Sequence, residues 1–219
     1  ALRAEHRFIY ASSAATYGDG SQGFIDDHAR LEYLKPLNSY GFSKYAFDLW
    51  LKQQGVLDQV VGLKYFNVFG PNENHKGRMA SMIYKMTLLV QKEKLIRLFA
   101  SSDPDQFADG EQSRDFIYVK DACEMTCEFL KNSIGGIFNI GSGATTTWRS
   151  LALAIFKTLK TPLNITFIKM PKELAIQYQN YTCADMQKYI KNVNQPKLYS
   201  IEDAVEDYVQ NYLIVDKRW

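Results

Sequence analysis

The sequence predicts an α/β fold: the C-terminal half of a doubly wound parallel sheet, with a smaller α/β domain beside it. Two observations carry this prediction. Apolar runs at residues 8–12 and 60–69 flank an amphipathic segment, and strand, helix and strand joined by short connections form the repeating unit of a parallel sheet. After Pro71, strand-like and helix-like segments still alternate, but less regularly. This change of pattern places a domain boundary near residues 70–75.

The first three elements can each be justified from their local pattern. Residues 8–12 form a short apolar run that ends in small side chains, which is typical of a buried strand. Residues 39–54 carry large apolar side chains at helical spacing, and Gly55 ends this segment as a helix C-terminal glycine. Residues 60–69 form a second continuous apolar run, which Gly70-Pro71 stops.

The second half of the chain continues with shorter elements. Strands are predicted over residues 95–99, 116–119, 136–140 and 164–168, and a polar loop over residues 103–111. Helices are predicted over residues 79–92, 121–131 and 147–159, and a last helix begins at Ser200, whose hydroxyl can cap it with Asp203 three residues on. We expect the strand at 136–140 and its adjoining helix to return to the first domain.

Composition excludes several classes of function. The 219 residues carry a net charge of +2 and contain no apolar run of the ~20 residues that a membrane span needs, so we expect neither a nucleic-acid partner nor a membrane. The odd set Cys123, Cys127 and Cys183 favours a reducing compartment, the cytoplasm, over a disulfide framework. The three histidines are scattered and complete no ligand spacing, so no metal site is expected.

Tyr40 and Lys44 are the first candidates for catalysis. Four residues apart on a helix, they share one face, and a nearby cation favours the phenolate form of a tyrosine. About one such pair is expected by chance in a chain of this composition, so the context decides. Ser13 follows the carboxyl end of a predicted strand, where open parallel sheets bind ligands, and its hydroxyl can orient a substrate alcohol. The three pieces occur in the order that such a site needs.

These motifs resemble the extended short-chain dehydrogenase/reductases that act on nucleotide sugars, the NAD-dependent epimerase/dehydratase family. The resemblance covers essentially the whole chain. Its segments are Tyr10-Ala-Ser-Ser-Ala-Ala-Thr-Tyr-Gly18, Lys35-Pro-Leu-Asn-Ser-Tyr-Gly-Phe-Ser-Lys44, Tyr65-Phe-Asn-Val-Phe-Gly-Pro71, His75-Lys-Gly-Arg-Met-Ala-Ser81, Arg114-Asp-Phe-Ile-Tyr-Val119 and Gly136-Ile-Phe-Asn-Ile-Gly-Ser-Gly143. The His75–Gly77 segment is the more specific pointer, toward members that epimerise ADP-heptose.

The resemblance implies an isomerase that inverts C6 of the heptose for lipopolysaccharide core supply, by transient oxidation with a bound nicotinamide. It implies that residues 1–72 are the C-terminal part of a Rossmann-like dinucleotide-binding domain and that residues 73–219 mostly bind substrate. The implied catalytic residues are Ser13, Tyr40, Lys44 and Lys76, the last as the second proton-transfer group. The implied cofactor contacts are Lys44, Val68 and Lys76. The implied substrate contacts are Ser13, Asn67, Arg78, Lys85, Phe99, Ala100, Ser101, Ser102, Arg114 and Tyr178.

The family's Gly-rich loop, which cradles the cofactor pyrophosphate at a helix N-terminus, does not occur in these residues. We therefore expect that roughly the first third of the enzyme is missing from this chain, and that the chain alone binds cofactor poorly. The segment Gly141–Gly143 is predicted to be a strand-to-helix turn, because it fails the dinucleotide fingerprint. NADP is implied by the family as the cofactor, with NAD possible, and a homo-oligomer as the assembly.

Two alternatives remain. One is another nucleotide-sugar enzyme, such as a UDP-hexose 4-epimerase or a dehydratase. A dehydratase needs an acidic pair just after the hydroxyl residue, where this chain has Ala14 and Ala15. The other alternative is a non-catalytic nucleotide-sugar-binding protein or fragment, which the joint presence of Ser13, Tyr40 and Lys44 argues against.

Overall fold

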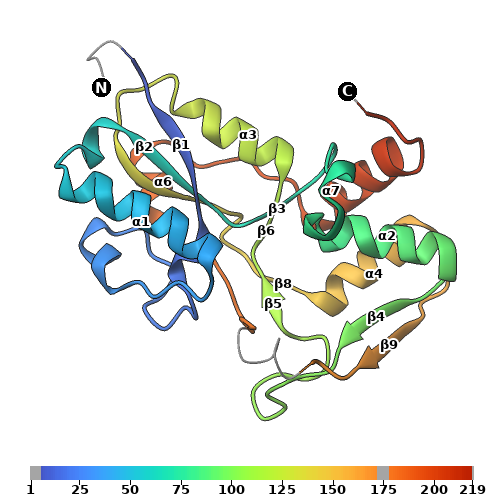
Figure 1. The fold of residues 1–219 in the computed structure, drawn as a ribbon. Coiled ribbons are helices and arrows are strands. Elements are labelled where there is room, and N and C mark those ends of the chain that lie inside the picture. The colour runs from blue at the N-terminus through green and yellow to red at the C-terminus, as the bar shows by residue number, and fades with distance from the viewer. Residues whose placement is uncertain (1–5, 172–177, 219) are drawn as a thin grey trace.

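A three-stranded parallel sheet organises the first half of the fold (Figure 1). The structure, a computed structural model, describes residues 6–171 and 178–218. Strands β1 (Ile9–Ser13), β2 (Val61–Tyr65) and β7 (Gly136–Ile140) lie in the order β1–β2–β7. Helix α1 (Ser39–Gln53) joins the first two. The predicted strand–helix–strand unit and the return of residues 136–140 to its sheet are therefore present.

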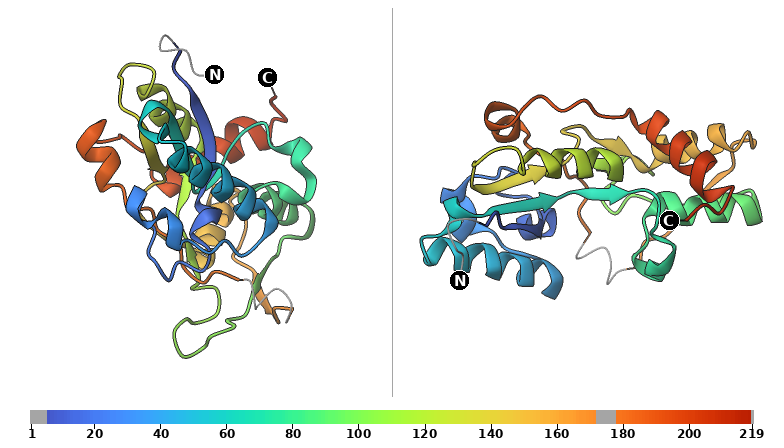
Figure 2. Two further views of the ribbon diagram at one scale, coloured as in Figure 1. Left: turned by 60° about the vertical axis from the view of Figure 1, so that its left-hand side comes forward. Right: turned by 90° about the horizontal axis from the view of Figure 1, so that it is seen from above.

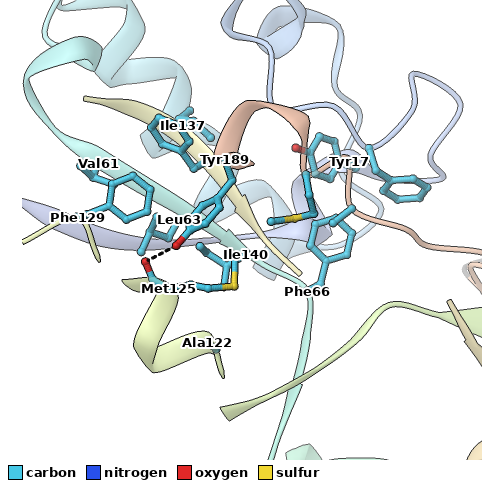
Figure 3. Packing of buried hydrophobic residues seen from close by; sticks show 14 of the residues in the cluster. Tyr17, Val61, Leu63, Phe66, Ala122, Met125, Phe129, Ile137, Ile140 and Tyr189 are labelled. Carbon is cyan, nitrogen blue, oxygen red and sulfur yellow. Dashed lines mark hydrogen bonds between the residues drawn. The ribbon is translucent and has the colours of Figure 1, made fainter. Parts of the chain in front are cut away.

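Helices cover both faces of this sheet. Helix α1 lies on one face, while α3 (Val119–Glu128) and α6 (Gln187–Asn192) lie on the other (Figure 2, right). The hydroxyl of Tyr189 on α6 donates to the carbonyl of Met125 on α3, 3.3 Å away (Figure 3). A parallel sheet buried between two helical layers is a doubly wound arrangement, which confirms the predicted fold class.

The second half of the fold contains smaller sheets and three longer helices. The strand pairs are β3 (Asn67–Phe69) with β6 (Phe116–Tyr118) and β4 (Ile96–Phe99) with β9 (Ile165–Ile168), both parallel, and β5 (Ser113–Arg114) with β8 (Thr146–Thr147), antiparallel. The helices are α2 (Met82–Glu93), α4 (Trp148–Thr158) and α7 (Ile201–Tyr208). Short 3-10 helices are η1 (Ala14–Tyr17), η2 (His28–Tyr33), η3 (Leu57–Gln59) and η4 (Asn74–Met79), and a π-helical turn, η5 (Val209–Leu213), follows α7.

Two hydrophobic cores underlie these two halves. The first packs the β1–β2–β7 sheet against α3 and α6, around residues such as Leu63, Phe129 and Ile137 (Figure 3). The second packs α2, α4 and α7 around β4 and β6. Strand β6 belongs to both cores, because Ile117 lies in the first and its neighbour Phe116 in the second. The division into residues 1–72 and 73–219 stays a prediction.

Some predicted boundaries are wrong. The apolar run 60–69 is two strands, because the amide of Phe66 donates to Ile140 while that of Asn67 donates to Asp115, so the chain changes partner strands at this point. Helix α2 begins at Met82, because the hydroxyl of Ser81 caps it by accepting from the amide of Tyr84, 3.2 Å away. Helix α3 spans residues 119–128, where 121–131 was predicted, and α6 was not predicted.

None of the helices in the described ranges is long and apolar enough to cross a membrane.

Candidate active site

Ser13 ends β1 and begins the turn that follows it. Its Oγ accepts a hydrogen bond from the amide of Ala15, 3.1 Å away, and so caps η1. A serine hydroxyl that accepts in this way still has its own proton to donate. The hydroxyl of Thr16 donates to the carbonyl of Ser13 over 2.8 Å and holds the turn from the other side. Ser13 is thus fixed with a donor left for a ligand.

Tyr40 and Lys44 lie on the first two turns of α1. Asn38 caps this helix, its Oδ1 accepting from the amide of Gly41 at 2.8 Å. A side chain at Gly41 would place its Cβ 2.7 Å from the carbonyl oxygen of Ala15, so glycine allows η1 to lie against α1 beside Tyr40. The predicted pair therefore packs against the turn that carries Ser13.

The two side chains of this pair differ in what they contact. Tyr40 is 58% exposed. Lys44 Nζ lies 5.9 Å from the centre of its ring and donates to the carbonyl of Ala11, 3.0 Å away. An ammonium has three donors, so Lys44 keeps donors for a ribose hydroxyl. An exposed phenol with such a lysine beside it fits a bound nicotinamide ribose.

A cavity of about 540 Å³ brings five of the predicted site residues together. They are Ser13 and Tyr40 from the β1–α1 region, Asn67 and Val68 from β3, and Lys76 from η4. The cavity lies where β1 and β2 end, the edge at which open parallel sheets bind ligands. Lining residues that the sequence analysis missed include Glu73, Trp148, Gln179 and Thr182.

Lys76 lies on the exposed 3-10 helix η4, and the buried Glu73 holds the two ends of this segment together. Glu73 is buried; its carboxylate accepts from the amide and the hydroxyl of Ser81, each at 2.6 Å, and its carbonyl accepts from the amide of Lys76 at 2.9 Å. Lys85 Nζ donates to the carbonyl of Arg78, 2.6 Å away. Neither Arg78 nor Lys85 lines the cavity, although both were predicted to contact substrate.

Arg114 lies beside the cavity among aromatic rings. Its guanidinium carbon lies 5.0 Å from the ring centre of Tyr178 and 5.8 Å from that of Trp148, which lines the cavity. Phe99 meets Tyr178 edge to face, with 6.5 Å between ring centres. The structure therefore brings three of the predicted substrate contacts together, with Phe99 and Arg114 both against the ring of Tyr178.

The Arg114 guanidinium is buried and has no ion-pair partner among residues 6–171 and 178–218. It is 8% exposed, and its Nη1 donates to the carbonyl of Ser113 over 2.9 Å. Burial lowers the pKa of Arg114, which the neighbouring Tyr178 partly offsets. Within the described ranges no carboxylate forms an ion pair with it. The planar fork of a buried guanidinium is suited to a bound diphosphate.

The loop after β4 does not reach the cavity. The amide of Ala100 donates to Ile168, and that of Ser101 donates to Asp109 Oδ1 at 2.7 Å. Ala100, Ser101 and Ser102 thus continue from Phe99 as a loop tied to its own surroundings, and none of them lines the cavity.

The turn at Gly141–Gly143 is occupied by a protein carboxylate. Asp115 is fully buried and accepts from the amides of Ser142 and Gly143 at 2.7 and 3.0 Å. These amides are therefore not free to hold a phosphate, which agrees with the prediction of a structural turn.

Comparison with known proteins gives consistent matches. The model of the NAD dependent epimerase/dehydratase family matches residues 1–141. The ADP-L-glycero-D-manno-heptose-6-epimerase of Nitratidesulfovibrio vulgaris strain DP4 is 49% identical over 209 residues, which cover 94% of this chain and 64% of that protein. The chain thus spans less than two thirds of that relative's length.

Two solved structures are also similar. The ADP-L-glycero-D-manno-heptose-6-epimerase of Helicobacter pylori superposes with a TM-score of 0.77 at 28% identity, covering 94% of this chain and 59% of that one. The UDP-N-acetylglucosamine 4-epimerase of Methanobrevibacter ruminantium superposes with a TM-score of 0.78 at 25% identity, covering 95% of this chain and 63% of that one.

Proposed function

This chain belongs to the NAD dependent epimerase/dehydratase family, and we propose that its protein inverts C6 of the heptose in ADP-D-glycero-D-manno-heptose, with NADP as the cofactor. The observation that carries the proposal is the cavity that Ser13, Tyr40 and Lys76 share. The 49% identity to an enzyme named for this epimerisation supports the choice of substrate.

Inversion at a carbon that bears a hydroxyl needs proton transfer in two orientations of the sugar. Tyr40 and Lys76 reach the cavity from different elements, α1 and η4, so each can serve one orientation. The hydroxyl of Ser13 donates a hydrogen bond to the sugar oxygen and holds that oxygen near the phenol of Tyr40. Removal of hydride from the sugar carbon and its return is the chemistry that a bound nicotinamide would supply.

Three other residues hold the ligands in this proposal. Lys44 would hold the nicotinamide ribose with the donors that Ala11 leaves free, and Val68, which lines the cavity, would contact the cofactor. Arg114 binds the diphosphate of the nucleotide sugar. The choice of NADP over NAD rests on the family resemblance. We also propose a homo-oligomer in the cytoplasm, and the three free thiols suit a reducing compartment.

The test is a turnover assay on the reading frame that contains these residues, with ADP-D-glycero-D-manno-heptose and either NADP or NAD. Proton NMR of the product reads the stereochemistry at C6. We expect inversion, and we expect Lys76→Met to reduce the rate by about 10²-fold or more. A folded, cofactor-bound protein that leaves the C6 stereochemistry unchanged would overturn the proposal.

A UDP-hexose 4-epimerase is the second candidate. The structural similarity to a UDP-N-acetylglucosamine 4-epimerase, with a TM-score of 0.78, favours it. The same assay with UDP-glucose and UDP-N-acetylglucosamine separates the two, because a 4-epimerase inverts C4 of these sugars and leaves the ADP-heptose unchanged.

A further inference from the structure

A buried ion pair lies beneath the candidate active site. Lys64 Nζ on β2 and Asp48 Oδ2 on α1 are 2.8 Å apart, and both side chains are fully buried. Asp48 follows Tyr40 and Lys44 at intervals of eight and four residues, so the three lie on the same face of α1. The residue that anchors this helix in the protein is therefore two turns from the exposed tyrosine.

Asp48 ties α1 to β1. Its Oδ1 accepts a hydrogen bond from the hydroxyl of Tyr10 at 2.9 Å, and its Oδ2 accepts from the hydroxyl of Ser12 at 2.8 Å. Ser12 directly precedes Ser13 on the strand. A single carboxylate thus fixes the helix that carries Tyr40 against the strand end that carries Ser13.

Lys64 ties the same pair to the turn after β1. Its Nζ donates to Thr16 Oγ1 at 2.5 Å, and Thr16 Oγ1 donates to the carbonyl of Ser13 at 2.8 Å. The ammonium also lies 5.0 Å from the ring centre of Tyr17. The ion pair is therefore connected by hydrogen bonds to β1, η1, α1 and β2, the elements that surround Ser13 and Tyr40.

We propose that Asp48 and Lys64 are positioning residues, which set the placement of Tyr40 relative to Ser13 through α1 and η1. The catalytic roles of Tyr40 and Ser13 are those of the proposed function, and this part of the inference rests on it. Burying two charges costs desolvation, and well-packed apolar residues often replace a buried pair with no loss of stability. Burial accordingly lowers the pKa of Lys64. Directional bonds fix distances that apolar packing leaves looser, and an error of about 1 Å at a reacting centre can cost about 10²-fold in rate.

The test compares variants in the reading frame that contains these residues. The double variant Asp48→Asn with Lys64→Met removes both charges without leaving either one buried alone. Lys64→Arg keeps the charge and the donors. Lys52→Met is the matched control, since Lys52 is on the same helix but pairs with Glu32 near the surface, at 3.1 Å.

We expect the double variant to lower kcat by ~10- to ~100-fold while KM changes by less than about threefold. Its Tm should stay within about 4 °C of the wild type. Amide hydrogen exchange in residues 39–48 should become at least about tenfold faster, with little change elsewhere in the sheet. Lys64→Arg should recover most of kcat, and Lys52→Met should match the wild type.

A double variant with wild-type kcat and wild-type exchange in residues 39–48 would overturn the inference. So would exchange that accelerates uniformly over the sheet, because that result describes general loosening. If the wild type shows no turnover on nucleotide sugars, the proposed function fails, and the exchange measurement still decides whether Asp48 and Lys64 position α1.

Discussion

Replacing Arg114 by methionine should separate ligand binding from stability. The guanidinium is 8% exposed, and its Nη1 donates to the carbonyl of Ser113 at 2.9 Å. It also lies over the rings of Tyr178 and Trp148. Methionine fills much of the same volume and keeps contact with both rings. The variant therefore removes the charge with little loss of packing.

The effects of Arg114→Met on the stability of the free protein and on ligand affinity can each be estimated. In the free protein it removes one hydrogen bond, about 1 kcal/mol, and cation–π contacts of about 0.5–2 kcal/mol. It also relieves the desolvation of a buried charge, which acts in the opposite direction. In the complex it removes two charge-assisted hydrogen bonds to phosphate of about 1.5–3 kcal/mol each. At about 1.4 kcal/mol per tenfold, the dissociation constant should rise by ~10²- to ~10⁴-fold.

Calorimetric titration with ADP, paired with thermal unfolding, measures both effects. Arg149→Met is the matched control, because Arg149 is an exposed arginine next to Trp148. We expect Arg114→Met to lose ADP affinity with its Tm within about 4 °C of the wild type, and Arg149→Met to change neither. Unchanged ADP affinity in Arg114→Met would refute the argument, and a Tm that falls by more than about 10 °C would show that Arg114 is structural.

Three further substitutions test other parts of the structure. Tyr40→Phe should lower kcat by ~10²- to ~10⁴-fold and leave ligand affinity within about threefold, whereas a non-catalytic binding protein has no turnover to lose. Burial and the charge of Lys188 hold the pKa of His28 below its ordinary value. As the pH drops from about 7 toward 5, His28 is therefore protonated in the unfolded chain before it is protonated in the folded protein, and the free energy of unfolding should fall. Denaturant titrations should show this slope flattened in His28→Gln and kept in His75→Gln. Asp115→Ala leaves three backbone amides without their acceptor, so the free energy of unfolding in urea should fall by about 3–5 kcal/mol. A fall below about 1 kcal/mol would contradict the role of Asp115 in holding these amides.

Local periodicity was enough to predict the sheet that carries the site. Buried strands and amphipathic helices each have a characteristic pattern of apolar residues. The strands β1 and β2 and the helix α1 lie where these patterns predict them. The break at Phe66 leaves no such pattern. Both sides of it are apolar, and only the hydrogen-bond partners, Ile140 before the break and Asp115 after it, show that the chain leaves one sheet for another.

The candidate site was predictable to the extent that its residues follow strand ends. Ser13 is the last residue of β1, and Asn67 and Val68 begin β3 one residue after β2 ends, so sheet topology brings them to one cavity. Trp148 and Gln179 enter the same cavity from distant segments whose pairing no local pattern specifies. A sequence also shows charges without showing burial.

Lys64 and Asp48 illustrate this last limit. A lysine in a strand and an aspartate on a helix are usually solvated, and nothing in their spacing of 16 residues distinguishes a buried pair from two surface charges. The side chain of Lys64 is buried because β2 is the central strand of its sheet, flanked by β1 and β7, and helices cover both faces of that sheet. That position follows from the return of β7 to the sheet, which is a long-range property of the fold.

The two proton-transfer groups of the proposed mechanism are exposed side chains on different elements, α1 and η4, and the β3–β6 pair lies between the two cores that support the fold. Helix α1, which carries Tyr40, contributes Leu51 to the first core, while β3, which precedes Lys76 in the chain, contributes Phe69 to the second. Strand β6 is shared between the cores, with Ile117 in the first and both Phe116 and Tyr118 in the second. In the proposed mechanism both groups must come within hydrogen-bond reach of one sugar hydroxyl, so we expect the rate to depend on how the β3–β6 pair places η4 relative to α1.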